Sequence, residues 1–327
     1  MAHRRTGTVV DKELLSETLL RFRLMPEEGT PFPAYRSGQH IALRRDDCKL
    51  TRKVGVGQDG KPQYEPDLDP WGRQQIGSVT HAYSVASAPA ETREHGWLEF
   101  VVALEQGQHG LPGRLSEALF NMGPESGGCE VKYLDRLAGN FTLSDRAGDA
   151  QSVLLVGTGT GVAPFASMVK QLHAEARADD TRRYTLVHAH RRVRELAFYR
   201  LFSEIEASGR FDFTYVPTIS RPAEEAEVDP HIGQGRANNV VRLIFGLPTA
   251  EEEKLTKAKS DISVVAANLA LERLVHPVLP RHLSADALKE RHPPGGTVLF
   301  TCGNPASMAD LQATAQRREI RFEMEAW

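Results

Sequence analysis

Cysteine and long hydrophobic runs are scarce in this sequence. Its 327 residues contain three cysteines, Cys48, Cys129 and Cys302, which lie far apart and form no Cys-x-x-Cys pair. Without a four-cysteine set, the chain carries no iron–sulfur cluster or zinc ribbon of its own. An odd, small number of cysteines also argues against a disulfide scaffold and suits a reducing compartment.

No segment is apolar over the length that is needed to span a bilayer, and the first ten residues lack the apolar core of a secretory signal. We therefore expect a cytoplasmic protein without a membrane span. The formal net charge of −3 gives no case for DNA or RNA binding, which needs a concentrated basic surface. What remains, 40% hydrophobic and 25% charged residues, is typical of a globular chain long enough for two domains.

The first part of the chain has the pattern of β structure. Short, partly alternating apolar runs are separated by Pro, Gly and charged residues, which predicts an antiparallel barrel or sandwich. A short helix at 115–120 would cap one end of the barrel. The polar stretch 44–79 is interpreted as an insertion without assignable chemistry. The predicted strands are 6–10, 18–24, 39–43, 80–87, 97–104 and 129–133.

Strands alternate with helices in the second part of the chain. The change follows a polar segment at 144–151, so we expect one domain at 1–147 and a second at 148–327. Such alternation predicts a parallel sheet that binds ligands at the carboxyl ends of its strands. A second insertion, 222–296, contains a helical candidate at 250–274 and is expected to be a structural appendage. The predicted strands are 153–156, 184–188, 211–216, 297–302 and 320–325, and the predicted helices are 162–176, 195–208 and 305–316.

The stretch 152–168 has the pattern of a strand, a tight turn and a helix. An apolar run leads into three glycines at alternate positions, and Pro164 stands where the first helical turn would begin. Glycines let a ligand approach the backbone, and a helix N-terminus offers N–H groups to a pyrophosphate. The spacing departs from the usual Gly-x-Gly-x-x-Gly fingerprint, so a turn without a ligand remains an alternative on this stretch alone. The predicted cradle consists of Gly157, Thr158, Gly159, Thr160 and Gly161.

Arginines recur beyond the next two predicted strands. An acidic residue at the end of the second strand of a dinucleotide site favours NAD, whereas arginine there suits the 2′-phosphate of NADP. Here that strand is followed by His-Arg-Arg-Val-Arg at 190–194, and the third strand by Ser-Arg at 220–221. A solvated basic face would explain any one arginine, but several guanidiniums and a hydroxyl can converge on one phosphate. We therefore predict NADP(H), bound through Arg191, Ser220, Arg221 and Arg236.

Six short motifs, in order, make the chain similar to the ferredoxin–NADP reductase family. In the first part, residues 35–40 resemble the family's Gly-Gln strand, 81–84 its Arg-x-Tyr-Ser flavin motif, and 113–119 its phosphate-binding helix. In the second part, residues 157–164, 194–199 and 302–305 match further motifs. The resemblance covers most of the sequence apart from the two insertions. It implies an FAD-binding antiparallel β-barrel of Greek-key type, an NADP-binding α/β domain, and hydride transfer between nicotinamide C4 and flavin N5.

The resemblance also implies roles for individual residues. Tyr83 would pack on the isoalloxazine with Ser84 near N5, and Cys302 would lie beside the nicotinamide. The last residue, Trp327, would stack on the flavin face and move aside for hydride transfer, with Glu325 near the nicotinamide. The implied catalytic residues are therefore Ser84, Cys302, Glu325 and Trp327. Implied contacts to FAD are His81, Ala82, Tyr83, Ser84, Gly113, Arg114, Leu115, Ser116 and Trp327, and Cys302 and Gly303 join the predicted contacts to NADP.

One position departs from the family pattern. His81 stands where the flavin motif usually has arginine. Histidine of ordinary pKa is mostly neutral at pH 7, so the fixed cation at the FAD pyrophosphate is weakened. Arg114 is the residue expected to compensate.

These features favour an FAD-dependent NADP(H) oxidoreductase that passes electrons to a one-electron carrier such as ferredoxin or flavodoxin. The alternative within the same superfamily is the reductase component of a multicomponent oxygenase. A third reading is a flavin-free nucleotide-binding regulatory module. No histidine has the spacing of a metal ligand, and no nucleic-acid partner is expected.

Overall fold

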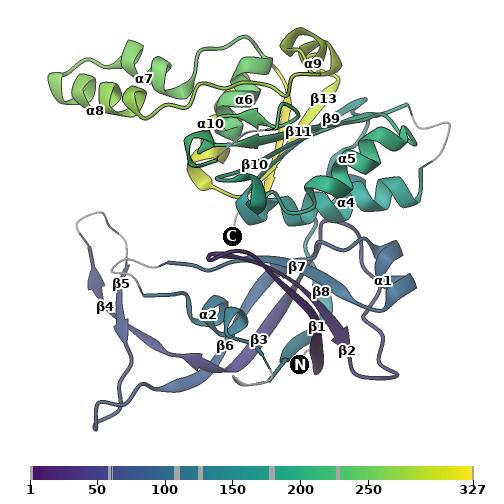
Figure 1. Cartoon of the computed structure of the whole chain (residues 1–327), viewed down its shortest axis with the longest axis vertical. Helices are drawn as coiled ribbons and strands as arrows, with labels where there is room; N and C mark the ends of the chain where they lie inside the picture. Colours follow the sequence, from purple (N-terminus) through teal and green to yellow (C-terminus); the bar gives the residue numbers. More distant parts are fainter. Residues whose placement is uncertain are drawn as a thin grey trace. The chain divides into compact units, whose positions relative to one another are not determined.

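The computed structural model describes residues 3–57, 60, 62–106, 111–123, 128–176, 181–225 and 229–325. The chain divides into two compact units, Met1–Asn140 and Phe141–Trp327 (Figure 1). The division falls earlier than the boundary expected at 147/148, because Phe141 packs against rings of the second unit. Its ring centroid lies 5.8 Å from that of Phe165 and 5.4 Å from that of Phe300.

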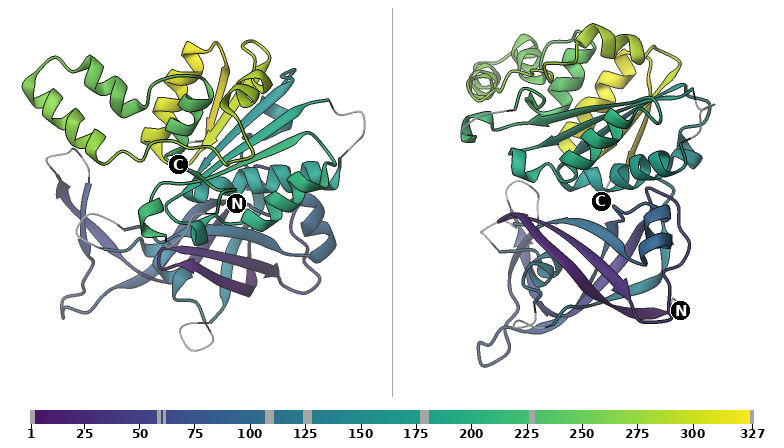
Figure 2. Two further views of the ribbon diagram at one scale, coloured as in Figure 1. Left: turned by 45° about the horizontal axis from the view of Figure 1, so that its top comes forward. Right: turned by 45° about the vertical axis from the view of Figure 1, so that its right-hand side comes forward.

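The first unit is built around a six-stranded antiparallel sheet in the order β6-β3-β8-β1-β2-β7. Beyond β6, the amide N of Ala86 donates to the carbonyl O of Glu99 on β7 at 2.8 Å, which joins the two ends of the sheet. Figure 2 shows this sheet curled into a barrel. The strands are β1 (Arg4–Ser16), β2 (Leu19–Pro26), β3 (His40–Lys49), β6 (Ile76–Ser84), β7 (Leu98–Ala103) and β8 (Glu130–Ala138).

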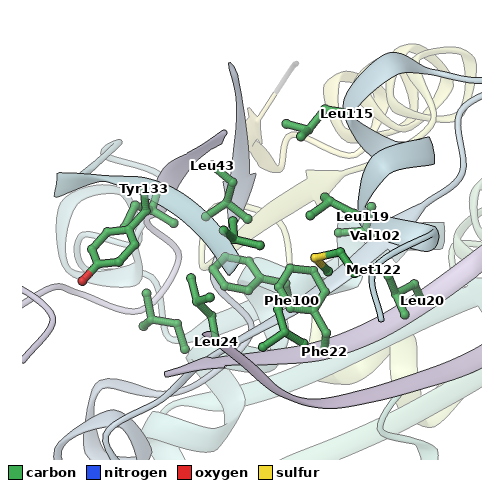
Figure 3. Packing of buried hydrophobic residues seen from close by; sticks show 14 of the residues in the cluster. Leu20, Phe22, Leu24, Leu43, Phe100, Val102, Leu115, Leu119, Met122 and Tyr133 are labelled. Carbon is green, nitrogen blue, oxygen red and sulfur yellow. The ribbon is translucent and has the colours of Figure 1, made fainter. Parts of the chain in front are cut away.

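Alternation along β2 and β7 places every second side chain in the interior of the barrel. Phe22 and Phe100 are opposite each other in the register and stack with centroids 5.1 Å apart (Figure 3). Helix α2 (Arg114–Phe120) adds Leu115 and Leu119 to the same buried cluster. The predicted capping helix is therefore confirmed. A second short helix, α1 (Pro89–His95), was not predicted.

The stretch 44–79, interpreted from the sequence as a polar insertion, is largely regular structure. Strand β3 continues to Lys49, and Lys49 pairs with Ile76 at the start of β6. Between them lies an antiparallel hairpin of β4 (Thr51–Val56) and β5 (Pro62–Pro66). Because the exposed hairpin strands carry mostly polar residues, the hydrophobic alternation that marks a half-buried strand is missing there.

The second unit contains a parallel six-stranded sheet in the order β12-β11-β10-β9-β13-β14, which confirms the predicted fold class. Figure 1 shows α4 and α5 on one face of this sheet and α6, α9 and α10 on the other. The strands are β9 (Ser152–Thr158), β10 (Arg183–His190), β11 (Phe213–Ile219), β12 (Gly233–Gln234), β13 (Thr297–Cys302) and β14 (Arg321–Glu325). The helices are α3 (Leu143–Arg146), α4 (Ala163–Ala174), α5 (Tyr199–Ser208), α6 (Ala237–Ile244), α7 (Ala250–Lys257), α8 (Asp261–Glu272), α9 (Ala285–Arg291) and α10 (Pro305–Arg317).

The segment 222–296 is more than the expected appendage. Helix α6 buries Val240, Val241 and Ile244 in the core of the parallel sheet. The helical candidate at 250–274 is two helices, because α7 ends at Lys257 and the Ser260 hydroxyl caps a new helix, α8. Only α7 and α8, which Figure 1 shows beside the sheet, fit the description of an appendage.

The predicted helix at 195–208 begins later than expected. A short 3-10 turn, Val193–Glu195, follows β10, and Phe198 has a positive φ of 66° that interrupts the helical backbone. Helix α5 therefore starts at Tyr199.

Candidate functional site

The carboxyl ends of β9, β13 and β14 lie in one row. Gly157 pairs with Cys302, and Cys302 pairs with Glu325 across the next strand. The strand order reverses at β9, because β10 lies on one side of it and β13 on the other. Open α/β sheets bind ligands in the crevice at such a reversal, and this row of strand ends lies beside it. The structure thus brings together three residues that the sequence placed near the nicotinamide and the nucleotide turn.

The glycine-rich turn after β9 packs tightly against the end of β13. A Cβ at Gly161 would overlap the carbonyl of Cys302, and a Cβ at Gly303 would overlap Thr158. The hydroxyl Oγ1 of Thr158 accepts a hydrogen bond from the amide N of Asn304 at 2.7 Å. The packing of the chain itself therefore requires glycine at 161 and 303.

The helix that follows this turn has an open start. The turn Gly159–Val162 and helix α4 have no side-chain cap, and the Thr160 carbonyl accepts from the amide of Ala163. Uncapped N–H groups at the start of a twelve-residue helix suit a pyrophosphate. The residues present thus fit the phosphates of a dinucleotide at this position.

The predicted NADP arginines lie along one edge of the sheet, where β10, β11 and β12 end side by side. Beyond the strands, the amide of Ser220 donates to the carbonyl of His190 at 2.9 Å, and that of Arg221 to the carbonyl of Arg191 at 3.0 Å. The amide of Gly235, next to Arg236, donates to Ile219 at 2.8 Å. Hence the three segments that carry these residues are neighbours in space.

Their guanidiniums do not meet at a single point. Arg192 and Arg221 share the carboxylate of Glu224, with Arg192 Nε 2.6 Å from Oε2 and Arg221 Nη1 3.1 Å from Oε1. These guanidiniums hold the pKa of the Glu224 carboxyl below its usual range. Arg191 is exposed, and within the described ranges no carboxylate pairs with its side chain.

Arg236 turns toward α7 instead. Its Nη1 lies 3.3 Å from Oε1 of Glu251, a buried carboxylate that also accepts from Asn239 Nδ2 at 2.8 Å. The sequence analysis did not name Arg192 or Glu224 as site residues. The Arg-Arg pair at 191–192 was a signal for Arg192, whereas no motif points to Glu224.

Contacts between His190 and Glu195 hold the loop after β10. Nδ1 of His190 lies 2.6 Å from Oε2 of Glu195, and the same oxygen accepts the amide of Arg192 at 3.2 Å. Glu195 is 5% exposed. The backbone that carries Arg192 is thus held by contacts that do not involve its guanidinium.

In the first unit, the flavin-like motif lies on the edge strand β6. His81 and Tyr83 pair with Leu43 and Ile41 of β3 and share their face of the sheet. His81 is exposed, whereas Tyr83 is half-buried against the barrel core. Burial raises the pKa of Tyr83, so its phenol is neutral at pH 7. A half-buried, neutral ring on this outer strand fits a planar aromatic ligand.

Ala82 and Ser84 alternate to the other face of β6, and Ser84 pairs with His40. The nearby Gly-Gln segment fastens this strand end, because the carbonyl of Gln39 accepts from the amide of Val85 at 3.0 Å. The Gln39 side chain donates to the carbonyl of Gly139 at 2.9 Å. These bonds fix the backbone that carries the motif.

The start of α2 is occupied by protein groups. The buried hydroxyl of Ser116 donates to the carbonyl of Gly113 at 3.1 Å and accepts from the amide of Glu105 at 3.2 Å. A Cβ at Gly113 would lie 2.6 Å from Oε2 of Glu105. The Glu105 carboxylate thus stands where the resemblance puts a pyrophosphate, with Arg114 and Leu115 opening the helix. The Glu105 residue itself is exposed to solvent.

A groove of about 760 Å³ lies elsewhere in the first unit, between α1 and the segment that joins β2 to β3. Phe32, Tyr35 and Pro89 are among the residues that line it, and none of the predicted site residues does. The Tyr35 hydroxyl is already bonded to the Ser87 carbonyl at 2.9 Å, and burial raises its pKa to about 12.

Trp327 lies outside the described residues, so its predicted role is not addressed by the structure. Within the described residues, no helix has the length and apolarity that crossing a membrane requires.

Comparisons with known proteins agree with this architecture. Residues 155–262 match the oxidoreductase NAD-binding domain family. A ferredoxin NADP+ reductase from Neisseria gonorrhoeae, solved with FAD and NADP, is 21% identical with a TM-score of 0.56, and 99% of each chain is covered. A cytochrome P450 reductase from Amycolatopsis is 19% identical with a TM-score of 0.56, covering 99% of this chain and 69% of the other. A ferredoxin reductase in carbazole 1,9a-dioxygenase is 15% identical with a TM-score of 0.54 and the same coverage. No curated protein sequence matches the chain.

The barrel, the parallel sheet and the matched domain define a two-domain oxidoreductase fold with an NAD-binding second domain. This is the fold of the ferredoxin–NADP reductase family, as the sequence motifs predicted.

Proposed function

We propose that the chain is an FAD-dependent NADP(H) oxidoreductase that passes electrons between NADPH and a one-electron carrier such as ferredoxin or flavodoxin. The observation that carries the proposal is the full-length match to a ferredoxin NADP+ reductase solved with both cofactors. The uncapped start of α4 and the half-buried ring of Tyr83 support it independently, because each suits one of the two cofactors. We place this reaction in the cytoplasm.

In this proposal the barrel holds FAD along β6 and the start of α2. Tyr83 packs on the isoalloxazine, Ser84 lies near N5, and His81 and Arg114 face the pyrophosphate. Bound FAD supplies the ability to accept a hydride and release electrons singly, while the protein orients both partners. Additional contacts come from Ala82, Gly113, Leu115 and Ser116.

The second unit holds NADP(H) at the carboxyl edge of its sheet. The backbone at 157–161 and Gly303 receives the pyrophosphate, and Arg191, Ser220 and Arg221 bind the 2′-phosphate. Arg236 joins them when its guanidinium leaves Glu251. We add Arg192 to this set because it reaches the same anion as Arg221. Cys302 and Glu325 are the residues proposed beside the nicotinamide, and Trp327 is proposed to stack on the flavin face until the nicotinamide displaces it.

The test is an anaerobic absorbance titration of the purified protein with NADPH and, separately, with NADH. We expect oxidised-flavin bands that bleach rapidly with NADPH and slowly with NADH. Equal bleaching with NADPH and NADH would contradict the NADP preference but would still support a flavin-dependent reductase. A protein that shows no flavin bands even after FAD is added would be the flavin-free nucleotide-binding module instead.

A second candidate is the reductase component of a multicomponent oxygenase. Its support is that two matched structures are a cytochrome P450 reductase and the ferredoxin reductase in a dioxygenase. NADPH-driven reduction of a flavodoxin, a free ferredoxin and an oxygenase-linked ferredoxin, assayed side by side, distinguishes the two. Turnover with only the oxygenase-linked carrier would favour this candidate.

A further inference from the structure

Glu224 sits between two arginines at the sheet edge proposed for the 2′-phosphate. It ends a short turn, Pro222–Glu224, that follows Arg221 directly. One carboxylate oxygen faces Arg192 on the loop after β10, and the other faces Arg221 after β11. A single anion thus bridges guanidiniums from two neighbouring strand ends.

The bridge is open to solvent. The exposed fractions of the Glu224, Arg192 and Arg221 side chains are 35%, 37% and 49%. A dissolved anion can therefore reach both guanidiniums if the carboxylate leaves. A phosphate carries more charge than a carboxylate and has more acceptor oxygens, so it is the stronger partner for paired arginines.

The surrounding backbone does not depend on this bridge. Glu225 accepts the amide of Val193 at 3.1 Å, and the amide of Arg221 donates to the carbonyl of Arg191. Glu195 holds the amide of Arg192. Removing the Glu224 carboxylate should consequently free two cations without unfolding the loops that carry them.

From this geometry we infer that Glu224 is a specificity-determining residue that competes with the 2′-phosphate of NADP(H) for Arg192 and Arg221. The inference rests on the proposed function, since it concerns the same nucleotide site. A ligand that bears the 2′-phosphate must displace Glu224, whereas a ligand without it leaves the bridge intact. The apparent affinity for the phosphorylated ligand is therefore reduced by the fraction of molecules in which the bridge is closed.

The experiment uses isothermal titration calorimetry on the full chain, with adenosine 2′,5′-bisphosphate and adenosine 5′-monophosphate as the probes. Because exposed ion pairs are individually weak, we expect Glu224→Gln to bind the bisphosphate about three- to tenfold more tightly than the unaltered chain. Its affinity for the monophosphate should stay unchanged. Glu224→Ala serves as a second variant, and thermal melting checks that both fold.

The matched control is Glu225→Gln, which removes the same charge one residue away without freeing a guanidinium. It should keep the original preference between the two probes. An equal gain in Glu225→Gln would overturn the inference, because the effect would then be one of net charge.

The outcomes also separate this inference from the proposed function. If the unaltered chain prefers the bisphosphate and Glu224→Gln binds it no better, Glu224 does not compete, and the NADP preference stands. If neither protein prefers the bisphosphate, the NADP preference fails and the inference fails with it.

Discussion

Two histidines of the second unit are buried in the neutral form. His188 on β10 is fully buried, accepts from or donates to the Tyr215 hydroxyl at 3.0 Å, and packs its ring on Phe202. His292 bonds Ser152 at 2.7 Å and Thr185 at 3.0 Å. Burial lowers the pKa of each to about 3. Both residues are therefore structural, and both link folding to pH.

The sign of this linkage follows from the lowered pKa. An unfolded histidine binds a proton near its ordinary pKa of about 6.5, whereas the buried one resists protonation until far lower pH. The stability contributed by each neutral histidine is complete above about pH 6.5 and is lost as the pH falls toward 3.

His188→Phe isolates one of these two groups. At pH 7 the variant should lose about 1 kcal/mol of unfolding free energy, because the Tyr215 hydroxyl loses its partner. Below pH 6.5 its stability should fall less steeply than that of the unaltered chain, by up to about 1.4 kcal/mol per pH unit. Urea unfolding at pH 7, 6 and 5 measures the difference, and parallel pH profiles would show that His188 titrates normally.

His81 gives a second prediction for a single residue, which concerns the proposed flavin site. Because arginine carries a permanent charge, His81→Arg should bind FAD about five- to tenfold more tightly at pH 7. Quenching of flavin fluorescence measures the affinity. Thr80→Arg is the control, since it adds the same charge on the opposite face of β6. Unchanged or weaker binding in His81→Arg would show that residue 81 does not face the pyrophosphate.

At the scale of elements, one arginine ties three helices together. Arg242 on α6 is 4% exposed, and its Nε donates to Asp310 on α10 at 2.8 Å. Its Nη1 donates to Glu253 on α7 at 2.7 Å and to the carbonyl of Pro248 at 2.9 Å. The pKa of Asp310 is lowered by its hydrogen bond with Arg242 despite burial. This network connects the exposed α7–α8 pair to the core of the unit.

Arg242→Met should cost about 2–3 kcal/mol of unfolding free energy, because it leaves the half-buried carboxylates of Asp310 and Glu253 without their shared partner. Urea unfolding of the full chain measures the loss. Adding Asp310→Asn to Arg242→Met should recover part of it, since the uncompensated charge is removed. A single variant as stable as the unaltered chain would mean that the network contributes nothing.

The sequence predicted the elements well where apolar residues keep a clear period. The strand 297–302 is found at those bounds, and the helix predicted at 305–316 ends one residue later, at Arg317. Prediction failed where the structure depends on packing that is distant in sequence. Helix α6 was not predicted, because the whole segment 222–296 was treated as an insertion. The hairpin within 44–79 was not predicted either, because it lacks a buried face.

The same limit applies to the candidate site. Strand ends and the glycine turn were predictable, because the parallel sheet brings successive strand ends to one edge. The bridge that Glu224 makes between Arg192 and Arg221 was not predictable. It depends on the turn after Arg221, which places the Glu224 side chain against Arg192. Likewise, no motif shows that Ser116 and Glu105 bond each other at the start of α2.

At the scale of the whole molecule, each unit has its own sheet and its own buried clusters. Phe22, Phe100 and their neighbours form a core within Met1–Asn140, whereas the clusters around Val156 and Ile219 lie within Phe141–Trp327. Apart from Trp327, the proposed flavin contacts lie in the first unit and the proposed nucleotide contacts lie in the second. Folding and nucleotide binding by the second unit should therefore not require the barrel.

We expect residues 141–327, expressed alone, to unfold cooperatively and to bind adenosine 2′,5′-bisphosphate within about twofold of the full chain, because independent sites couple by only about 0.3–0.5 kcal/mol. Calorimetry on the fragment and on the full chain measures both properties. Arg221→Gln in the fragment is the control, and it should weaken bisphosphate binding without changing the melting temperature. A folded fragment with no affinity for the bisphosphate would mean that the barrel supplies part of the nucleotide site.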